Sequence, residues 1–370
     1  MREDILTTEL QKVSSESQRR ELYSMDWLDD KDKIIEGAFA ECYLKMHPMI
    51  CIHGILFTID GIVSDESGIK NDIYSMVRPY VTSGLARKVE QLLQKIKLEA
   101  YSEPLPLQTD RIHVANGTLF LNGEFSEQKD FCLNRLPVIY DPDVEKPARW
   151  LKFMEELLNP DDILTLQEYM GYMLLPTTKA QKMMLIIGKG GEGKSRIGLV
   201  LRELFGNNMY SCSLQKIEVD KFARANLEYM LITVDDDMKL EALPQTNHIK
   251  SIVTLEDQID LERKGQQSFQ GVVYARLIAF GNGGLHALYD KTDGFYRRQL
   301  ILTTKDKVDG REDDPYLIDK LRKERDGIFL WALEGLQRLV SNNYVFTESV
   351  DAKQNLVDAQ EEGNNILAFM

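Results

Sequence analysis

The residues best suited to chemistry lie in GKGGEGKS, residues 188–195, directly after the apolar run MMLII. The string matches the pattern G-x-x-x-x-G-K-[ST], which ends here in Gly193, Lys194 and Ser195. Glycines let backbone N–H groups approach phosphate oxygens, lysine can reach the β- and γ-phosphates, and a serine hydroxyl can ligate Mg²⁺. The sequence therefore predicts a nucleoside triphosphate site, for which we expect the binding residues Gly188, Gly190, Gly191, Glu192, Gly193, Lys194, Ser195 and Arg196.

A phosphate loop needs acidic side chains at the end of a neighbouring strand. The segment MLITVDDD places Asp235, Asp236 and Asp237 after an apolar run. One carboxylate would hold Mg²⁺ and another would orient or deprotonate the attacking water. We expect Asp235 to serve the metal and Asp236 the water, with Asp237 as the substitute. Together with the loop, these acids predict hydrolysis of ATP with Mg²⁺.

Two further polar features follow in the chain. Asn282 comes at the end of the apolar run in IAFGNGG, where its amide could align water against the γ-phosphate. Arg297 and Arg298 stand together in TDGFYRRQLIL, before another apolar run. A guanidinium can neutralise charge that builds on the transferred phosphoryl group, often from a neighbouring subunit. We therefore count Asn282, Arg298 and, less strongly, Arg297 among the catalytic candidates.

Short apolar runs that alternate with helical patterns must position these groups. Residues 183–187, 229–234 and 276–281 have the length of buried strands, and helical stretches separate them. This alternation predicts an α/β fold with a parallel sheet. Helical periodicity also covers residues 147–175 and the segment LIDKLRKERDGIFLWALEGLQRLV.

The first third of the chain predicts a mixed region. In RIHVANGTLFLNGEF, Asn116-Gly117 separates two β-like runs and indicates a hairpin. The segment before it, SEPLPLQTD, has the composition of a linker. The remaining expected elements are a helix over residues 17–47, two short strands in MICIHGILFTIDG, and helices at 70–80 and 84–99.

Composition narrows the class of protein. The 370 residues are 43 % hydrophobic and 28 % charged, as in a globular protein, with a formal net charge of −14. This charge disfavours a protein coated by nucleic acid, although a small basic element can lie within an acidic body. The four cysteines are scattered without a CxxC pair, so no zinc site is expected. The polar start and short apolar runs predict a cytoplasmic protein without membrane association.

The order of loop, acids, Asn282 and arginine pair resembles superfamily 3 helicases, which belong to the AAA+ ATPases. The resemblance is closer to the primase-helicase family of phages, plasmids and poxviruses. It covers nearly the whole chain from about residue 105 and includes long strings. These strings are RIHVANGTLFL, LPVIYDPD, LQEYMGYML, HIKSIVTLEDQIDLERKGQQSFQG, FGNGGLHALYDKTDGFYRRQ and GIFLWALEGLQRL.

The resemblance implies roles for individual residues. The loop residues and the acids fall on the family's nucleotide loop and metal-binding strand, Asn282 on its sensor, and Arg298, or else Arg297, on its arginine finger. QIDLERKGQQSFQ, residues 258–270, takes the place of a hairpin that grips DNA in the ring pore, with Arg263 and Lys264 near its tip. Basic residues and a glycine between polar β-like flanks agree with a phosphate-contacting hairpin.

The resemblance also divides the chain. It implies an N-terminal mixed α/β region (1–105), a hairpin and helical region (106–180), an AAA+ ATPase core (181–305) and a C-terminal helical segment (306–370). Residues 1–105 show no polymerase carboxylate cluster, so primase activity is not expected. Many family members continue into a winged-helix module, whereas this sequence stops at NNILAFM.

The expected function is an ATP-dependent, ring-forming replicative DNA helicase of a phage or mobile element, in the host cytoplasm. The resemblance implies a homo-oligomer, expected to be a hexamer, that acts on single-stranded DNA and meets other replication proteins. An AAA+ initiator or loader that binds DNA without processive unwinding is the alternative. A small-molecule kinase would leave the arginine pair and the basic hairpin unexplained.

Overall fold

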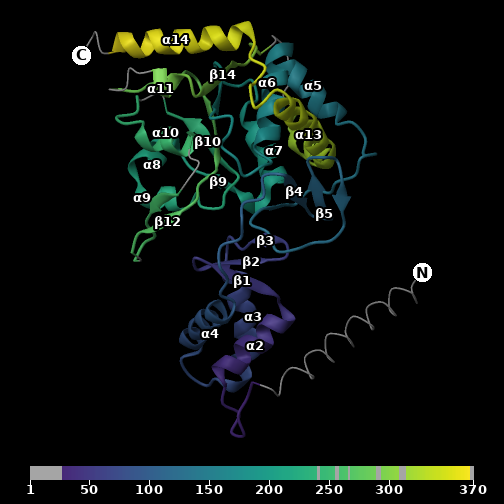
Figure 1. Cartoon of the computed structure of the whole chain (residues 1–370), viewed down its shortest axis with the longest axis vertical. Coiled ribbons are helices and arrows are strands. Elements are labelled where there is room, and N and C mark those ends of the chain that lie inside the picture. The colour runs from purple at the N-terminus through teal and green to yellow at the C-terminus, as the bar shows by residue number, and fades with distance from the viewer. Residues whose placement is uncertain are drawn as a thin grey trace. The chain divides into compact units, whose positions relative to one another are not determined.

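The protein is described by a computed structural model over residues 27–239, 242–254, 258–265, 267–288, 293–307 and 314–366. The chain forms two compact units, Met1–Leu105 and Pro106–Met370 (Figure 1). None of the helices in these ranges combines the length and apolarity that a membrane span requires.

In its described part, from residue 27 onward, the first unit packs the helices α2, α3 and α4 against a small antiparallel sheet of order β1-β2-β3. Its core contains the fully buried side chains of Phe39, Leu56, Leu92 and Ile96. The two predicted strands and the helices predicted at 70–80 and 84–99 are confirmed. Its elements are α2 (Glu36–Met46), β1 (Met49–Ile52), β2 (Ile55–Thr58), β3 (Gly61–Ile62), α3 (Ser67–Val77), η1 (Arg78–Tyr80) and α4 (Leu85–Glu99).

The helix predicted over residues 17–47 is too long at its start. Residues 17–26 lie outside the described ranges, and the helix begins only at Glu36. In between, the carboxylate of Asp29 accepts hydrogen bonds from the backbone N–H groups of Lys31 (2.9 Å) and Lys33 (2.8 Å). Such side-chain bonds stabilise a turn that competes with helix, although the apolar spacing of the segment favours helix.

The second unit starts with a four-stranded sheet of order β6-β5-β4-β7. The predicted hairpin is confirmed, with β4 and β5 paired antiparallel. A Cβ atom on Gly117 would collide with the carbonyl oxygen of Ser126, so this position requires glycine. The predicted helical stretch at 147–175 forms two helices. The elements are β4 (Arg111–Val114), β5 (Gly117–Phe120), β6 (Phe125–Ser126), β7 (Arg135–Leu136), α5 (Ala148–Leu157) and α6 (Pro160–Tyr172).

A five-stranded sheet of order β14-β8-β13-β10-β9 forms the centre of this unit, and all its strand pairs are parallel. The predicted fold class, an α/β core with a parallel sheet behind a smaller mixed region, is confirmed. The strands are β8 (Met183–Ile187), β9 (Met209–Ser211), β10 (Ile232–Met238), β13 (Arg276–Gly281) and β14 (Gln299–Thr303).

Helices cover both faces of the sheet (Figure 1). Met184 and Ile186 of β8 point into one core with α5, α6 and α7, whereas Met183 and Leu185 point into the other with α8 and α10. Both faces are buried, which explains the continuous apolar runs. The other helices are α7 (Ser195–Phe205), α8 (Leu214–Val219), α9 (Lys221–Ala225), α10 (Asn247–Thr254), α11 (Asp293–Tyr296), α12 (Leu317–Lys323), α13 (Arg325–Ser341) and α14 (Val350–Ile366).

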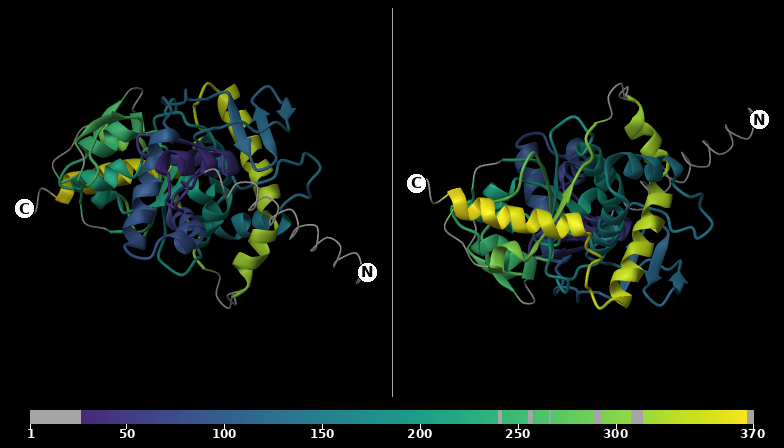
Figure 2. Two further views of the ribbon diagram at one scale, coloured as in Figure 1. Left: turned by 90° about the horizontal axis from the view of Figure 1, so that it is seen from below. Right: turned by 90° about the horizontal axis from the view of Figure 1, so that it is seen from above.

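The C-terminal helices pack closely against the core. The helical segment predicted after residue 316 is two helices, because it breaks at Glu324, whose carboxylate accepts the N–H groups of Arg149 and Trp150. The indole rings of Trp150 and Trp331 meet edge to face with 5.6 Å between centroids. Asn355 of α14 donates to the carbonyl of Ile301 at 3.0 Å, which ties α14 to the edge strand β14 (Figure 2).

Candidate nucleotide-binding site

A cavity of about 370 Å³ opens at the carboxyl ends of β8, β10 and β13. Parallel strands direct their carboxyl ends to one edge, so segments distant in sequence meet there. The phosphate loop, two of the three aspartates and Asn282 lie together at this edge. The lining residues are Phe153, Gly190, Gly191, Glu192, Gly193, Lys194, Ser195, Arg196, Asp236, Asp237, Phe280, Gly281, Asn282, Asp314 and Leu317.

The backbone of the loop depends on its glycines. Gly190, Gly191 and Gly193 have φ values of 108°, 83° and 108°, a region that disfavours side chains. At Gly188 a Cβ atom would collide with the hydroxyl of Thr304. The helix α7 begins at Ser195, so its free N–H groups and positive dipole end lie next to the loop. This arrangement suits an anion.

Lys194 is buried at the base of the cavity with 8 % exposure. Its Nζ atom lies 3.0 Å from Oε2 of Glu192 and 3.5 Å from Oδ1 of Asn282. Oε1 of Glu192 accepts the N–H of Gly190 at 2.7 Å. Burial of Glu192 opposes its ionisation, but the hydrogen bonds from Lys194 and from backbone N–H groups outweigh it, so its pKa lies below the usual value. Glu192 is therefore a buried carboxylate inside the loop.

The three aspartates of β10 have different surroundings. Asp235 is 4 % exposed, does not line the cavity, and accepts the N–H of Leu214 at 2.9 Å. Asp236 faces α7, since its Oδ1 atom would lie 3.2 Å from a Cβ on Gly198, and Asp237 also lines the cavity. Burial is the main cause that raises the pKa of both Asp235 and Asp236. The geometry thus places Asp236 and Asp237 on the cavity. Asp235, the residue expected to hold the metal, does not line it.

The oxygen donors at this edge fit Mg²⁺. Among the described residues no three histidine, cysteine or acidic side chains form a group that could hold a metal by themselves. Mg²⁺ commonly uses one or two carboxylates, with phosphate oxygens and water as its other ligands. The Ser195 hydroxyl and the carboxylate of Asp236 lie on one cavity and supply that kind of partial ligand set.

The arginine pair lies away from this cavity. Gln299 of β14 pairs with Met183 at the start of β8, so Arg297 and Arg298 lie at the amino edge of the sheet. Arg297 is exposed, and the guanidinium of Arg298 donates to the carbonyl of Gly294. Neither arginine lines the cavity of its own chain.

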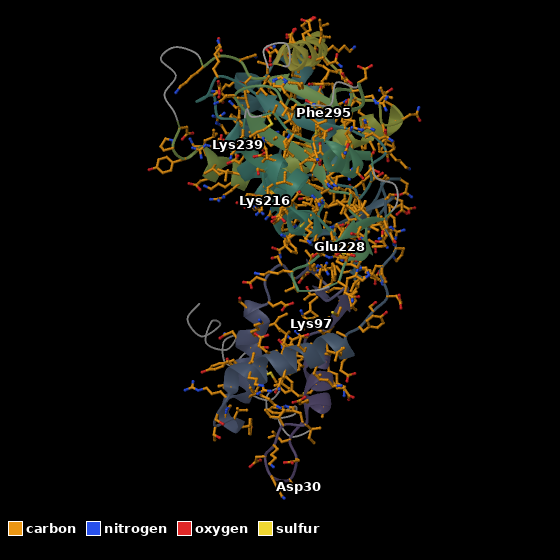
Figure 3. The ribbon with its side chains drawn as sticks, turned by 90° about the vertical axis from the view of Figure 1, so that its left-hand side faces the viewer. Asp30, Lys97, Lys216, Glu228, Lys239 and Phe295 are labelled. Atoms are coloured by element: carbon orange, nitrogen blue, oxygen red, sulfur yellow. The ribbon has the colours of Figure 1, made fainter. Side chains whose placement is uncertain are left out.

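The predicted basic hairpin is present as β11 (Ile259–Leu261) and β12 (Phe269–Gly271), paired antiparallel. Lys264 and Gly265 form an exposed turn, with Gly265 at φ 77°. Arg263 instead forms an ion pair with the buried carboxylate of Glu228 and stacks on Phe269 at 4.6 Å. In Figure 3, Glu228, which marks the hairpin side of the unit, lies well apart from Phe295, which precedes Arg297 and Arg298 in the chain. Lys264 is therefore the hairpin cation presented to solvent.

Several site residues carry no local sequence signal. The cavity is also lined by Phe153 of α5, which precedes the sheet strands in the sequence. Asp314 and the α12 residue Leu317, which follow the strands in the sequence, line it as well. Phe153 and Leu317 read as ordinary core positions, and only the tertiary packing brings them to the loop. At the turn end of the hairpin, Lys221 pairs with Glu262 at 2.6 Å, next to Phe222, which is 38 % exposed.

Comparison with known proteins agrees with this architecture. Residues 186–298 match a family of unknown function (DUF5906), and the loop, the acids, Asn282 and both arginines lie in this range. Structures of the NrS-1 C-terminal region are similar to this chain. An A-form apo structure gives a TM-score of 0.56 at 11 % identity and covers 87 % of this chain and 74 % of that one. Another apo structure (residues 305–718) gives a TM-score of 0.52 at 10 % identity, over 85 % and 76 %. At these identities the likeness shows the fold.

Proposed function

We propose that this chain is an ATP-dependent DNA helicase of the superfamily 3 type, which forms a ring and hydrolyses ATP between subunits. One observation carries the proposal: a phosphate loop, two carboxylates and a sensor amide line a single cavity at the carboxyl edge of a parallel sheet. Ligands of open α/β sheets bind at this edge. The resemblance of the sequence to phage and mobile-element helicases supports the same conclusion.

The cavity residues suggest a division of roles. N–H groups of the glycine-rich loop and the α7 N-terminus would bind the phosphates, and Lys194 would neutralise the β- and γ-phosphate oxygens. Ser195 and Asp236 would hold Mg²⁺, which polarises the γ-phosphate. Asp237 would orient or deprotonate the attacking water, and Asn282 would align it from the other side. The role first expected of Asp235 passes to Asp236.

The position of Arg298 supports catalysis between subunits. β8 and β14 run in register from their first to their last residues, so Arg298 lies six residues, or roughly 20 Å, along the sheet from the start of the loop at Gly188. An arginine side chain of the same subunit does not span that distance to the γ-phosphate. We propose that Arg298 completes the site of a neighbouring subunit in a ring, for which the family resemblance implies six members.

The hairpin is the proposed contact to single-stranded DNA. Lys264 projects at an exposed turn, and a ring would repeat it around a central pore. Such repetition concentrates positive charge locally in a body with a net charge of −14 per chain. ATP-driven movement of the hairpins would then carry the strand through the ring.

A second candidate, an AAA+ initiator or loader, follows from the state of Arg263. Its ion pair with Glu228 withdraws one of the two predicted tip cations, which leaves Lys264 to grip the strand. Such a protein would bind DNA and hydrolyse ATP but would not displace a strand on any forked substrate. A strand-displacement assay therefore separates the two candidates.

The first test is ATP hydrolysis by Lys194→Ala. Because the substitution removes the buried lysine that lines the cavity, we expect kcat to fall by about 100-fold or more. The matched control is Lys189→Ala, a lysine of the same loop that is 80 % exposed, pairs with Asp306 and does not line the cavity. The control should keep near wild-type turnover. Equal activity of Lys194→Ala and wild type would refute the proposed function.

A further inference from the structure

The carboxylate of Glu192 lies inside the phosphate loop and accepts hydrogen bonds from two of the loop's own donors. The residue lines the cavity, yet only 2 % of its surface is exposed. The glycines on both sides of it, Gly191 and Gly193, adopt positive φ. A bound phosphate would need the same donors that this carboxylate uses.

The contacts of the carboxylate are those that suit a phosphate oxygen. Oε1 accepts the backbone N–H of Gly190 at 2.7 Å, and Oε2 accepts from Nζ of Lys194 at 3.0 Å. A loop N–H and the loop lysine are the donors on which phosphate binding depends. Both partners of the ion pair are largely buried, with side-chain exposures of 9 % for Lys194 and 3 % for Glu192. Each charge thus needs the other, or a substitute of the same sign.

We propose that Glu192 is an internal anion that fills the phosphate cradle, and that nucleotide binds by displacing its carboxylate from Gly190 and Lys194. The inference rests on the proposed function, because it assumes that the cavity binds nucleotide. It makes Glu192 a residue that sets nucleotide affinity by competition. In the free subunit, the Glu192 carboxylate balances the positive charge of Lys194. When nucleotide binds, a phosphate oxygen would balance that charge instead.

Two substitutions distinguish occupancy of the phosphate-binding space by the Glu192 carboxylate from a general effect of its negative charge. Glu192→Gln removes the charge, so Lys194 loses its internal counter-ion. Glu192→Asp keeps the charge but is one methylene shorter, so it cannot bridge Gly190 and Lys194 together. We expect both variants to bind a fluorescent ADP analogue about tenfold more tightly than wild type. The reason is that nucleotide no longer has to displace the charge-assisted contact between Glu192 and Lys194. Glu127→Gln, an exposed acid with the same change of charge, should match wild type.

The outcomes are distinct. Tighter binding by both variants supports displacement. If only Glu192→Gln binds more tightly, charge alone is responsible and occupancy of the cradle is overturned. Unchanged or weaker binding by both variants, with wild type still binding and hydrolysing ATP, overturns the inference but leaves the proposed function intact. If no variant and no wild-type protein binds ADP, the proposed function itself fails and the inference fails with it. Thermal unfolding of each free variant checks that all are folded.

Discussion

Asp235 and Asp236 are adjacent in the sequence, and the alternation of a β-strand turns their side chains to opposite faces of the sheet. Asp235 fastens the start of α8 through the N–H of Leu214, whereas Asp236 faces α7 at the cavity. The two carboxylates therefore differ in what they contribute, one to the fold and one to the site. Sequence spacing alone treats them as equivalent.

Substitution of each aspartate tests this difference. We expect Asp236→Asn to lower kcat for ATP by about 100-fold and to raise the Mg²⁺ concentration needed for half-maximal rate. Asp235→Asn keeps an acceptor for Leu214, so it should retain turnover and lose about 1 kcal/mol of stability at most. ATPase rates over a Mg²⁺ titration and thermal melts measure the two effects. Loss of turnover in Asp235→Asn alone would reverse the assignment.

At the scale of elements, the strand β10 explains why the site was predicted only in part. The apolar runs 183–187, 229–234 and 276–281 locate the three strands, and the loop follows the first as expected. The face to which Asp235 points depends on strand register, and the pairing of β10 with β13 is interrupted between Asp235 and Met238. A local pattern does not encode that irregularity. The cavity wall from Phe153 and Leu317 likewise depends on helix packing.

The β4–β5 hairpin carries a buried histidine that predicts a dependence of stability on pH. Burial, and then the positive charges of Arg135 and Arg111, lower the pKa of His113 to about 4. An unfolded histidine titrates near 6.5. The unfolded chain therefore takes up a proton that the fold excludes, and stability is lost as pH falls from about 6.5 towards 4.

We expect the free energy of unfolding to fall by about 2 kcal/mol more in wild type than in His113→Asn between pH 7 and pH 5. Asparagine can keep a hydrogen bond to Thr118, whose hydroxyl lies 2.9 Å from Nδ1 of His113. Denaturant unfolding at both pH values measures the difference. Parallel loss of stability in the two proteins would show that His113 is protonated freely in the fold.

The β11–β12 hairpin should couple ATP hydrolysis to the DNA strand. Lys264→Ala is expected to abolish strand displacement, to keep basal ATPase, and to reduce the salt dependence of single-stranded DNA binding. Lys152→Ala, an exposed lysine of α5, serves as the control. Strand displacement by Lys264→Ala at the wild-type rate would remove the hairpin from the mechanism.

At the scale of the whole molecule, the sheet separates the loop from Arg298 by its full strand length, and the proposed function therefore takes the arginine of each site from a second chain. Arg298→Ala should lose hydrolysis and keep ATP affinity close to wild type. Mixed with Lys194→Ala, it should regain part of the turnover, because some interfaces then pair an intact loop with an intact arginine. Loss of hydrolysis in Arg297→Ala in place of Arg298→Ala would give the role to the exposed Arg297. Normal ATPase in Arg298→Ala, or no recovery on mixing, would contradict catalysis in trans.

The packed pair Trp150 and Trp331 provides an optical readout. The chain has three tryptophans, and the third, Trp27, lies in the other unit. Trp150 also lies 6.0 Å from the ring of Phe153, which lines the cavity. Replacement of Trp27 by phenylalanine would confine tryptophan fluorescence to the unit Pro106–Met370. Its emission and near-ultraviolet dichroism would then follow ligand occupancy in the unlabelled protein, in real time.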